Sequence, residues 1–132
     1  MLVGQASRSR GAASNQWLVA WNIQNLDPTP IQILAGRLPH SQFWGEEKEL
    51  SPSIKLLPNE SAQLNFSVTC NEPPGTVVEN AFLILRVLWP EKPWRIFARL
   101  RVVFDEQGGP QAATELVTAQ PIGFSEGKEI TS

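Results

Sequence analysis

The sequence has only one cysteine and one histidine, and it has no tyrosine. A single cysteine, Cys70, cannot form a disulfide within the chain, so packing alone must hold the fold together. A single histidine, His40, cannot supply the several imidazoles of a multi-histidine metal site. The glycines at 108–109 are followed by proline and not by the lysine of a phosphate-binding loop. We therefore expect neither a metal nor a bound cofactor.

Long apolar runs and an excess of positive charge are also missing. No stretch approaches the roughly 20 apolar residues needed to span a bilayer, and residues 1–15 lack the apolar run of a secretory signal. The formal net charge of -2 provides no positive field that would attract nucleic acid or an anionic membrane. We expect a cytoplasmic protein that binds neither a membrane nor nucleic acid.

The composition favours one domain built from short strands. The 132 residues suffice for one core, and 42% hydrophobic with 18% charged residues is a globular balance. Eleven prolines and nine glycines leave little room for long helices, because proline in a helix interior costs about 3 kcal/mol. Apolar residues alternate with polar ones over 17–23, 31–38 and 64–70, and turn-forming residues occupy 25–30. These features predict an all-β chain.

Two segments lack such alternation. Residues 2–14 are rich in Gly, Ala, Ser and Arg and show no apolar period, so we predict a flexible tail over residues 1–15. Residues 39–53 carry an acidic run and are predicted to form a long irregular connection that crosses from one sheet to the other, either without regular structure or with a short strand inside it. We expect the β-sandwich domain to cover residues 16–120, with a second flexible tail over residues 121–132.

The strongest pattern is a pair of apolar runs, 77–89 and 94–104, which a four-residue connection separates. Closing this connection as a hairpin places Trp89 opposite Trp94 and fixes every later pair. One face is then entirely apolar: it pairs Val87 with Ile96, Leu85 with Ala98, Leu83 with Leu100 and Ala81 with Val102. With a last short strand over 115–120, the turn spacing predicts a single immunoglobulin-like sandwich of about seven antiparallel strands.

A family resemblance lies in three segments: WNIQN at 21–25, PIQI at 30–33 and LPNESAQL at 57–64. They resemble immunoglobulin-like modules of the bacterial cell-adhesion type and of the ASPM, SPD-2 and Hydin family. The chain departs from those families at Asp27, Pro28 and Asn59, where they often carry glycine. The resemblance implies an immunoglobulin-like fold and a role in attachment or scaffolding, and it carries over no active site.

Catalytic side chains are scarce. Nucleophilic catalysis would need a nucleophile beside an oriented base, and Cys70 with His40 is the only pair to consider. Cys70 falls on the apolar face of its strand, where a thiol is usually an inert small hydrophobe. His40 lies in the predicted irregular connection and is interpreted as a solvated or capping residue. The acids, including Glu46, Glu47 and Glu49, fall mainly in turns and tails, so we do not expect an enzyme.

The candidate binding site is the second face of the predicted hairpin, where each pair joins an arginine to a large apolar residue. Its residues are Phe82, Ile84, Arg86, Leu88, Arg95, Phe97, Arg99 and Arg101. Interface cores favour this mixture, since Arg stacks on rings and makes several directed hydrogen bonds. We expect the face to bind a protein partner or a second copy of the chain. The alternative is a solvated face whose arginines are neutralised within the monomer by the acids at 46–49 or 105–106.

The five tryptophans leave a second functional class open. Flat rings on a sandwich can stack on sugars. Four of the five fall in phase with core-facing positions: Trp17, Trp21, Trp89 and Trp94. Trp44 alone lies in the predicted irregular connection. The alternative function is therefore a carbohydrate-binding module that uses Trp44 and the 39–53 segment.

Overall fold

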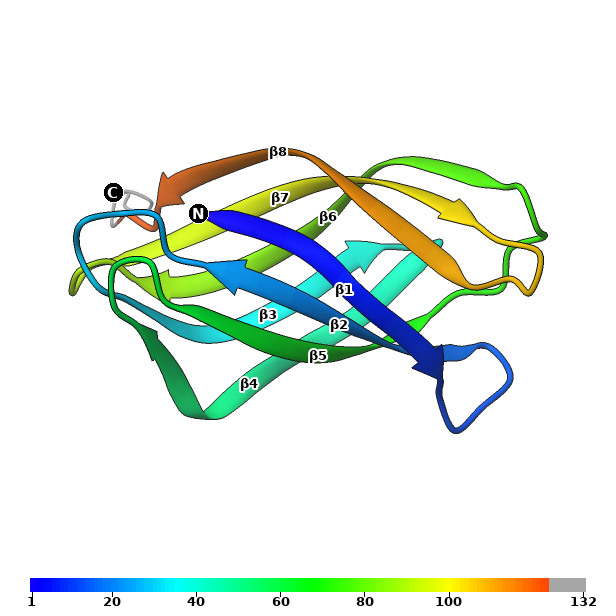
Figure 1. Cartoon of the computed structure of the whole chain (residues 1–132), viewed down its shortest axis with the longest axis horizontal. Coiled ribbons are helices and arrows are strands. Elements are labelled where there is room, and N and C mark those ends of the chain that lie inside the picture. The colour runs from blue at the N-terminus through cyan, green and yellow to red at the C-terminus, as the bar shows by residue number, and fades with distance from the viewer. Residues whose placement is uncertain (124–132) are drawn as a thin grey trace.

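The computed structural model describes residues 1–123, which form eight strands and no helix (Figure 1). The strands are β1 Leu2–Arg10, β2 Gln16–Gln24, β3 Ile31–His40, β4 Phe43–Leu56, β5 Ser61–Thr69, β6 Val77–Leu88, β7 Pro93–Phe104 and β8 Pro110–Pro121. Every neighbouring pair is antiparallel. The prediction of an all-β chain of antiparallel strands is confirmed.

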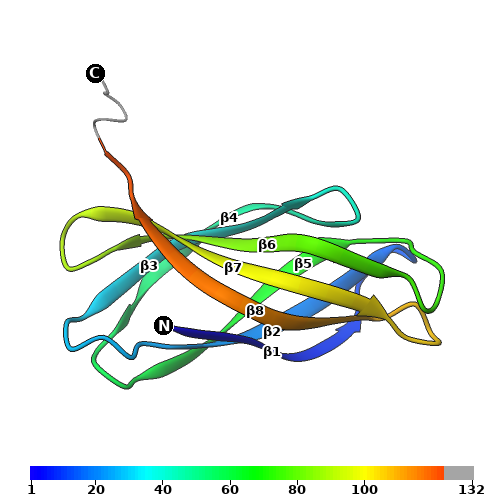
Figure 2. The same cartoon turned by 90° about the horizontal axis from the view of Figure 1, so that it is seen from above.

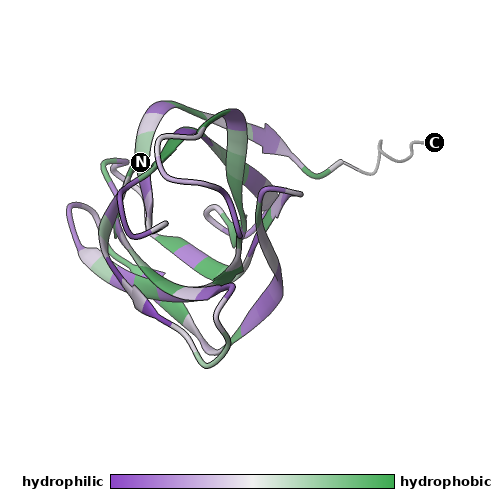
Figure 3. Cartoon of the chain, turned by 90° about the vertical axis from the view of Figure 1, so that its right-hand side faces the viewer, coloured by the Kyte–Doolittle hydropathy of each residue, from purple (hydrophilic) through white to green (hydrophobic). Residues whose placement is uncertain are grey.

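The strands form one sheet in the order β1-β2-β5-β4-β3-β6-β7-β8. The consecutive strands β3, β4 and β5 lie side by side, and the connections before and after them skip across the sheet, so that β2 pairs with β5 and β6 pairs with β3. This arrangement is a pair of overlapping Greek keys. The sheet curls until its two edge strands, β1 and β8, contact each other, and the molecule is barrel-like when viewed end-on (Figure 3).

The prediction of a seven-strand, two-sheet immunoglobulin-like sandwich is wrong, because all eight strands belong to one nearly closed sheet. Backbone pairing within this sheet is incomplete at two junctions between neighbouring strands. Between β4 and β5 the ladder is reduced to the single pair Trp44 and Thr69. Between β1 and β8 there are contacts but no backbone ladder within residues 1–123. Alternation along a sequence predicts strands but not closure, since non-local pairings decide between a barrel and a sandwich.

Apolar side chains at alternate positions fill the interior. The predicted inward residues of β2 are at most 5% exposed: Trp17, Val19, Trp21 and Ile23. The ring of Trp21 meets Phe43 of β4 edge-on, with the ring centroids 6.4 Å apart. Gly36 of β3 leaves room for the Phe66 ring of β5, since a Cβ at position 36 would lie 2.5 Å from that ring. The predicted core face of β2 is confirmed, and side chains from different strands interdigitate.

The predicted turn between β2 and β3 is held by a buried amide. Asn25 is fully buried, and its Nδ2 donates hydrogen bonds to the carbonyls of Thr29 and Leu56 at 3.0 Å each. The Nε1 of Trp89 donates to side-chain oxygens of Asp27 and Thr29 in the same turn. The turn therefore joins the end of β4 to the loop between β6 and β7.

The prediction of an N-terminal flexible tail is wrong, because residues Leu2–Arg10 form strand β1. The strand pairs with β2 along its length, with one irregularity between Gln5 and Ser7. Val3 is its one buried apolar residue, and Leu2 is exposed. The positions from Gly4 to Arg10 carry polar or small side chains that suit an edge strand. Alternation could not reveal β1, since backbone pairing rather than a buried face holds it.

The predicted irregular connection over residues 39–53 is also wrong, because it contains the end of β3, a turn at 41–42 and most of β4. The pairing of β4 with β3 is interrupted between Glu49 and Ile54, where the strand bends. The charged residues 46–49 are all exposed. On the side of β5, this part of β4 has no paired strand beyond the single pair Trp44 and Thr69. An apolar period is therefore absent from a segment that is nonetheless a strand.

The predicted C-terminal tail over residues 121–132 lies almost wholly outside the described residues. Pro121 is the last residue of β8, which begins at Pro110. This strand is therefore longer at both ends than the predicted 115–120. Its first residues pair with the end of β7 directly after the turn, where no apolar alternation marks them.

The predicted hairpin of β6 and β7 has the right faces and the wrong pairs. Leu88 lies opposite Pro93 rather than Arg95, so the register differs by two residues from the predicted one. The amide of Trp89 donates to the carbonyl of Lys92 at 2.8 Å, inside the turn. A shift by two residues keeps each side chain on its predicted face. The apolar face is buried, as predicted.

Candidate interaction surface

The residues predicted for the partner site lie together on the outer face of two strands. β6 contributes Phe82, Ile84, Arg86 and Leu88, and β7 contributes Arg95, Phe97, Arg99 and Arg101. The rings of Phe82 and Phe97 meet edge-on, with centroids 6.4 Å apart. The prediction that each pair joins an arginine to an apolar residue is wrong. Phe82 does lie opposite Arg99, but Arg86 lies opposite Arg95.

Three of the four arginines on this face form ion pairs within the chain. The pairs are Arg86 with Glu49 (2.5 Å) and Glu47 (3.8 Å), Arg99 with Glu115 (3.6 Å), and Arg101 with Glu79 (3.1 Å). All of these side chains are at least a third exposed, so each pair is worth about 0–1 kcal/mol. The acids at 46–49 thus neutralise one arginine, while Asp105 pairs with Arg8 of β1 instead.

Arg95 differs from these three arginines. It forms no ion pair with any residue of 1–123, and it lies directly opposite Arg86 in the β6–β7 ladder. Like charges directly opposite each other destabilise a sheet. Arg37 of β3, which lies opposite Ile84 on the other side of β6, also lacks an ion pair among the described residues. Two guanidinium groups are therefore available to an external anion.

A hollow of about 590 Å³ lies where β3, β4, β6 and β7 meet on this outer surface. Its lining consists of Arg37 and Pro39 of β3, Trp44, Gly45, Glu46 and Glu47 of β4, Ile84 and Arg86 of β6, and Arg95 of β7. The side chain of Trp44 is 43% exposed, and the residue lies opposite Pro39 in the β3–β4 ladder. Trp44 and part of the arginine face, which were predicted as rival sites, therefore line the same hollow.

Sequence reasoning missed Arg37, and it assigned Pro39 and Trp44, as parts of the 39–53 segment, to a site separate from the hairpin face. Arg37 and Pro39 of β3 are both exposed, although the period of two set by Ile31, Ile33 and Ala35 would point them inward. Irregularities in the ladder between Ile33 and Ala35 and between Gly36 and Leu38 reverse the phase of the strand. The place of Arg37 and Pro39 beside the hairpin depends on the ladder that sets Arg37 opposite Ile84. Alternation along one strand shows neither such a reversal nor which strands are neighbours. No local signal could therefore have assembled the hollow.

Cys70 and His40 each have a structural role. Cys70 is 5% exposed within the core cluster, and burial raises the pKa of its thiol to about 11. The Nδ1 of His40 accepts a hydrogen bond from the Gln42 amide at 3.1 Å, which caps the turn before β4. Across residues 1–123, no group of three or more His, Cys, Asp or Glu side chains is placed to hold a metal ion.

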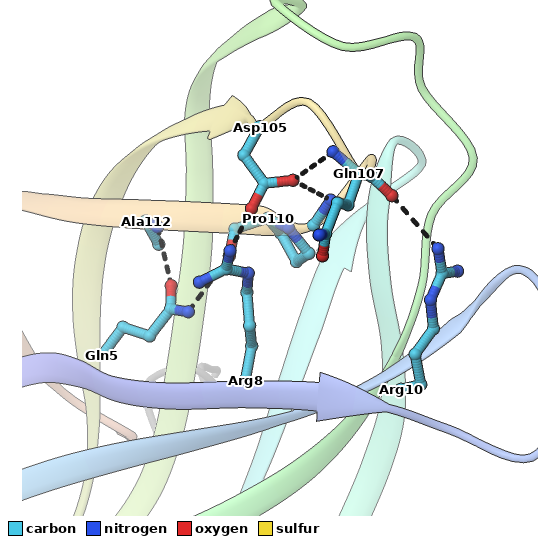
Figure 4. A network of polar contacts seen from close by, with 8 residues as sticks. Gln5, Arg8, Arg10, Asp105, Gln107, Pro110 and Ala112 are labelled. Carbon is cyan, nitrogen blue, oxygen red and sulfur yellow. Dashed lines mark hydrogen bonds and ion pairs between the residues drawn. The ribbon is translucent and has the colours of Figure 1, made fainter.

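The side chain of Gln5 joins the two edge strands (Figure 4). It donates to the carbonyl of Pro110 at 3.1 Å and accepts from the amide of Ala112 at 2.6 Å, so it replaces part of the missing backbone ladder. Toward the N-terminus the two strands diverge (Figure 2), and a hollow of about 190 Å³ opens there between Met1 and Val117. The closure of the sheet is therefore firm at one end only.

Asp105 stabilises the closed end of the junction between β1 and β8 (Figure 4). Its carboxylate accepts hydrogen bonds from the amides of Gly109 and Gln107 and pairs with Arg8. These contacts, led by the Gly109 bond, hold the pKa of the Asp105 carboxyl below its ordinary 3.8. The carboxylate is engaged by groups of the chain itself, so we assign it a structural role.

The fold and the surface together define an antiparallel, barrel-like β protein with a mixed arginine and aromatic outer face. Comparison with protein-family models and with curated proteins gave no match. Residues 1–123 contain no helix that could cross a membrane. The function must therefore be argued from the surface itself.

Proposed function

We propose that this chain is a non-catalytic protein-interaction module that binds a protein partner or a second copy of itself. The binding surface is the outer face of β6 and β7 with the adjoining hollow. The observation that carries the proposal is this hollow, where the exposed ring of Trp44 lies with Arg37 and Arg95, which have no ion pair within residues 1–123. Trp and Arg are enriched among the residues that dominate binding energy.

The strands give this surface a fixed shape. Sites built on strands hold their side chains more precisely than sites on loops do. The ion pairs of Arg86, Arg99 and Arg101 leave the face with little excess charge. Recognition would therefore depend on shape and on directed hydrogen bonds rather than on long-range attraction. A role in attachment or scaffolding is part of the same proposal.

Site-specific photo-crosslinking in cells of the source organism tests the proposal. A benzophenone amino acid replaces Leu116, which is 48% exposed and lies opposite Arg99. The matched control is Leu18 of β2, which is 47% exposed on a strand separated from β6 by three others. We expect a discrete adduct from position 116 alone, and we expect Arg95→Glu to abolish it. Adducts from both positions, or from neither, would contradict the proposal.

Arg95→Glu suits this test because it places a carboxylate opposite Arg86, where an opposite charge stabilises the ladder. Loss of the adduct would then not reflect unfolding. Lys92→Glu in the exposed β6–β7 turn makes the same change in charge outside the face, and it should leave the adduct intact. Light scattering of the purified chain then separates a foreign partner from a second copy, since self-association at least doubles the measured mass.

The exposed ring of Trp44 favours a second candidate, a carbohydrate-binding module that uses this ring and the 39–53 segment. Aromatic rings present a flat apolar face to sugars. A glycan array followed by fluorescence titration checks this candidate, with Trp44→Ala as the control variant. Saturable binding that Trp44→Ala removes would support it, and silence across the array would exclude it.

A further inference from the structure

We propose that the hollow binds an acidic, extended peptide segment of the partner, with its carboxylates on Arg37 and Arg95 and an apolar side chain on Trp44. This inference rests on the proposed function and specifies the chemistry of its ligand. The three residues come from β3, β7 and β4 and line the same hollow. Arg37 is in register with Ile84 and Phe97. Arg95 therefore lies two strand spacings and two residues away from Arg37, so the two arginine stems stand about 12 Å apart across β6.

The first argument is the local imbalance of charge. Arg86 and Arg95 oppose each other in the ladder, and the chain supplies Glu49 and Glu47 to Arg86. Residues 1–123 supply no such acid to Arg95. An external carboxylate would neutralise Arg95 as Glu49 neutralises Arg86. Unfavourable contacts between like charges persist at functional sites, where a binding partner offsets them.

The second argument is the bidentate geometry of arginine. A guanidinium group matches a carboxylate with two parallel hydrogen bonds, which fixes the orientation of the ligand as well as its position. Arg37 and Arg95 are both exposed, so their hydrogen-bond donors can reach a ligand without unfolding any element. Two such groups on either side of β6 suit a segment that carries more than one acidic side chain.

The third argument concerns the acids in the lining. Glu46 and Glu47 lie in the same hollow beside Trp44, so a ligand with uniform negative charge would be repelled at that end. Trp44 and Pro39 form an apolar pair there, and Ile84, which is 9% exposed, lies beneath the ligand. An extended peptide that carries two acidic residues and one large apolar residue at alternate positions meets both conditions, because alternate side chains of an extended chain point to the same side. A nucleic acid or a uronic acid polymer does not.

The test is an NMR titration of the isotope-labelled full chain. The probe is the synthetic peptide acetyl-Glu-Ser-Glu-Ser-Leu-amide, in which both Glu side chains and the Leu side chain point to one side of the extended chain, and its control is the same peptide with Gln in place of each Glu. The indole N–H of Trp44 is the reporter. We expect saturable shifts with the acidic peptide, a dissociation constant raised at least about tenfold by Arg95→Gln or Arg37→Gln, and no saturation with the Gln peptide.

The matched variant is Lys92→Gln, which also removes one positive charge, because Lys92 is exposed in the β6–β7 turn, lies outside the binding surface and does not line the hollow. It should change the dissociation constant less than about twofold. Equal binding of the Gln peptide, indifference to Arg95→Gln, or saturation only by an oligogalacturonate would overturn the inference. If the peptide fails to bind while the Leu116 adduct persists, the ligand chemistry is wrong and the proposed function stands.

Discussion

At the scale of one residue, the carboxylate of Asp105 makes the stability of the fold depend on pH. It accepts hydrogen bonds from the amides of Gly109 at 2.8 Å and Gln107 at 2.9 Å. The Gly109 bond is the leading cause of a pKa below 3.8 for this carboxyl in the folded chain. A carboxyl with a lowered pKa stabilises the fold above its unfolded-state pKa, and the stabilisation is lost as the pH falls through the folded-state pKa.

We therefore predict that Asp105→Asn lowers the unfolding temperature at pH 7 and changes it progressively less as the pH falls from 3.8 through the lower folded-state pKa, where the wild-type carboxyl also loses its charge. Thermal unfolding followed by circular dichroism across this range measures both. Glu106→Gln is the control, because Glu106 is exposed and forms no hydrogen bond or ion pair in the described chain. Parallel profiles for wild type and Asp105→Asn would show that the contacts of Asp105 do not stabilise the fold.

The thiol of Cys70 gives the opposite dependence on pH. Burial raises its pKa from 9.0 to about 11. The unfolded chain therefore loses this proton first, and stability falls as the pH rises from 9.0 toward 11. We predict slow alkylation of the native chain by iodoacetamide near neutral pH and complete alkylation in urea, both read by mass spectrometry. Labelling of the native chain at the unfolded rate would mean that Cys70 is not buried.

At the scale of elements, the strands that could be predicted are those with one buried and one solvent-exposed face. β2 and β5 show this alternation because their inward side chains pack in the interior while the outward ones meet water. β1 and β4 could not be predicted in the same way. Val3 is the one buried apolar residue of β1, and the charged residues 46–49 of β4 are exposed. Both strands depend on neighbours that are distant in sequence.

Gly36 tests how closely two of these elements approach. An added Cβ would lie 2.5 Å from the ring of Phe66 and 3.1 Å from Leu85, so the core cannot accept it without movement. We predict that Gly36→Ala lowers the free energy of unfolding by about 1–3 kcal/mol, measured by urea denaturation. Gly4→Ala in β1 meets no atom within 4 Å and should change it by less than about 0.5 kcal/mol. Equal effects would contradict the close contact of β3 and β5.

At the scale of the whole molecule, the hairpin face could be predicted and the hollow could not. β6 and β7 are consecutive in sequence, so closing the short turn between them as a hairpin was enough to predict that their arginines and aromatic residues share one face. An error of two residues in the register left their faces unchanged. Arg37, Pro39 and Trp44 reach this face only because the Greek-key order sets β3 beside β6. The fold differs from the expected sandwich because all eight strands pair in one sheet, whereas Greek-key order occurs in sandwiches as well.

The closure of the sheet makes β1 essential to the whole molecule. Without residues 1–10, the side chain of Gln5 no longer joins β8 to β1, and β2 becomes an exposed edge that invites self-association. We predict that a chain beginning at Gly11 loses at least about 2 kcal/mol of unfolding free energy, since it loses the buried Val3 and these hydrogen bonds. Urea denaturation and light scattering measure the two effects.

A synthetic peptide of residues 1–12 should restore stability to the truncated chain, because β1 pairs with β2 along its full length. The same peptide carrying Val3→Asp is the control, since a charge at this buried position has no partner there. Rescue by the first peptide alone would show that β1 acts through its pairing and its one apolar anchor. If the truncated chain is as stable as the full one, residues 1–10 do not close the sheet, and the N-terminal segment is the tail that its composition suggests.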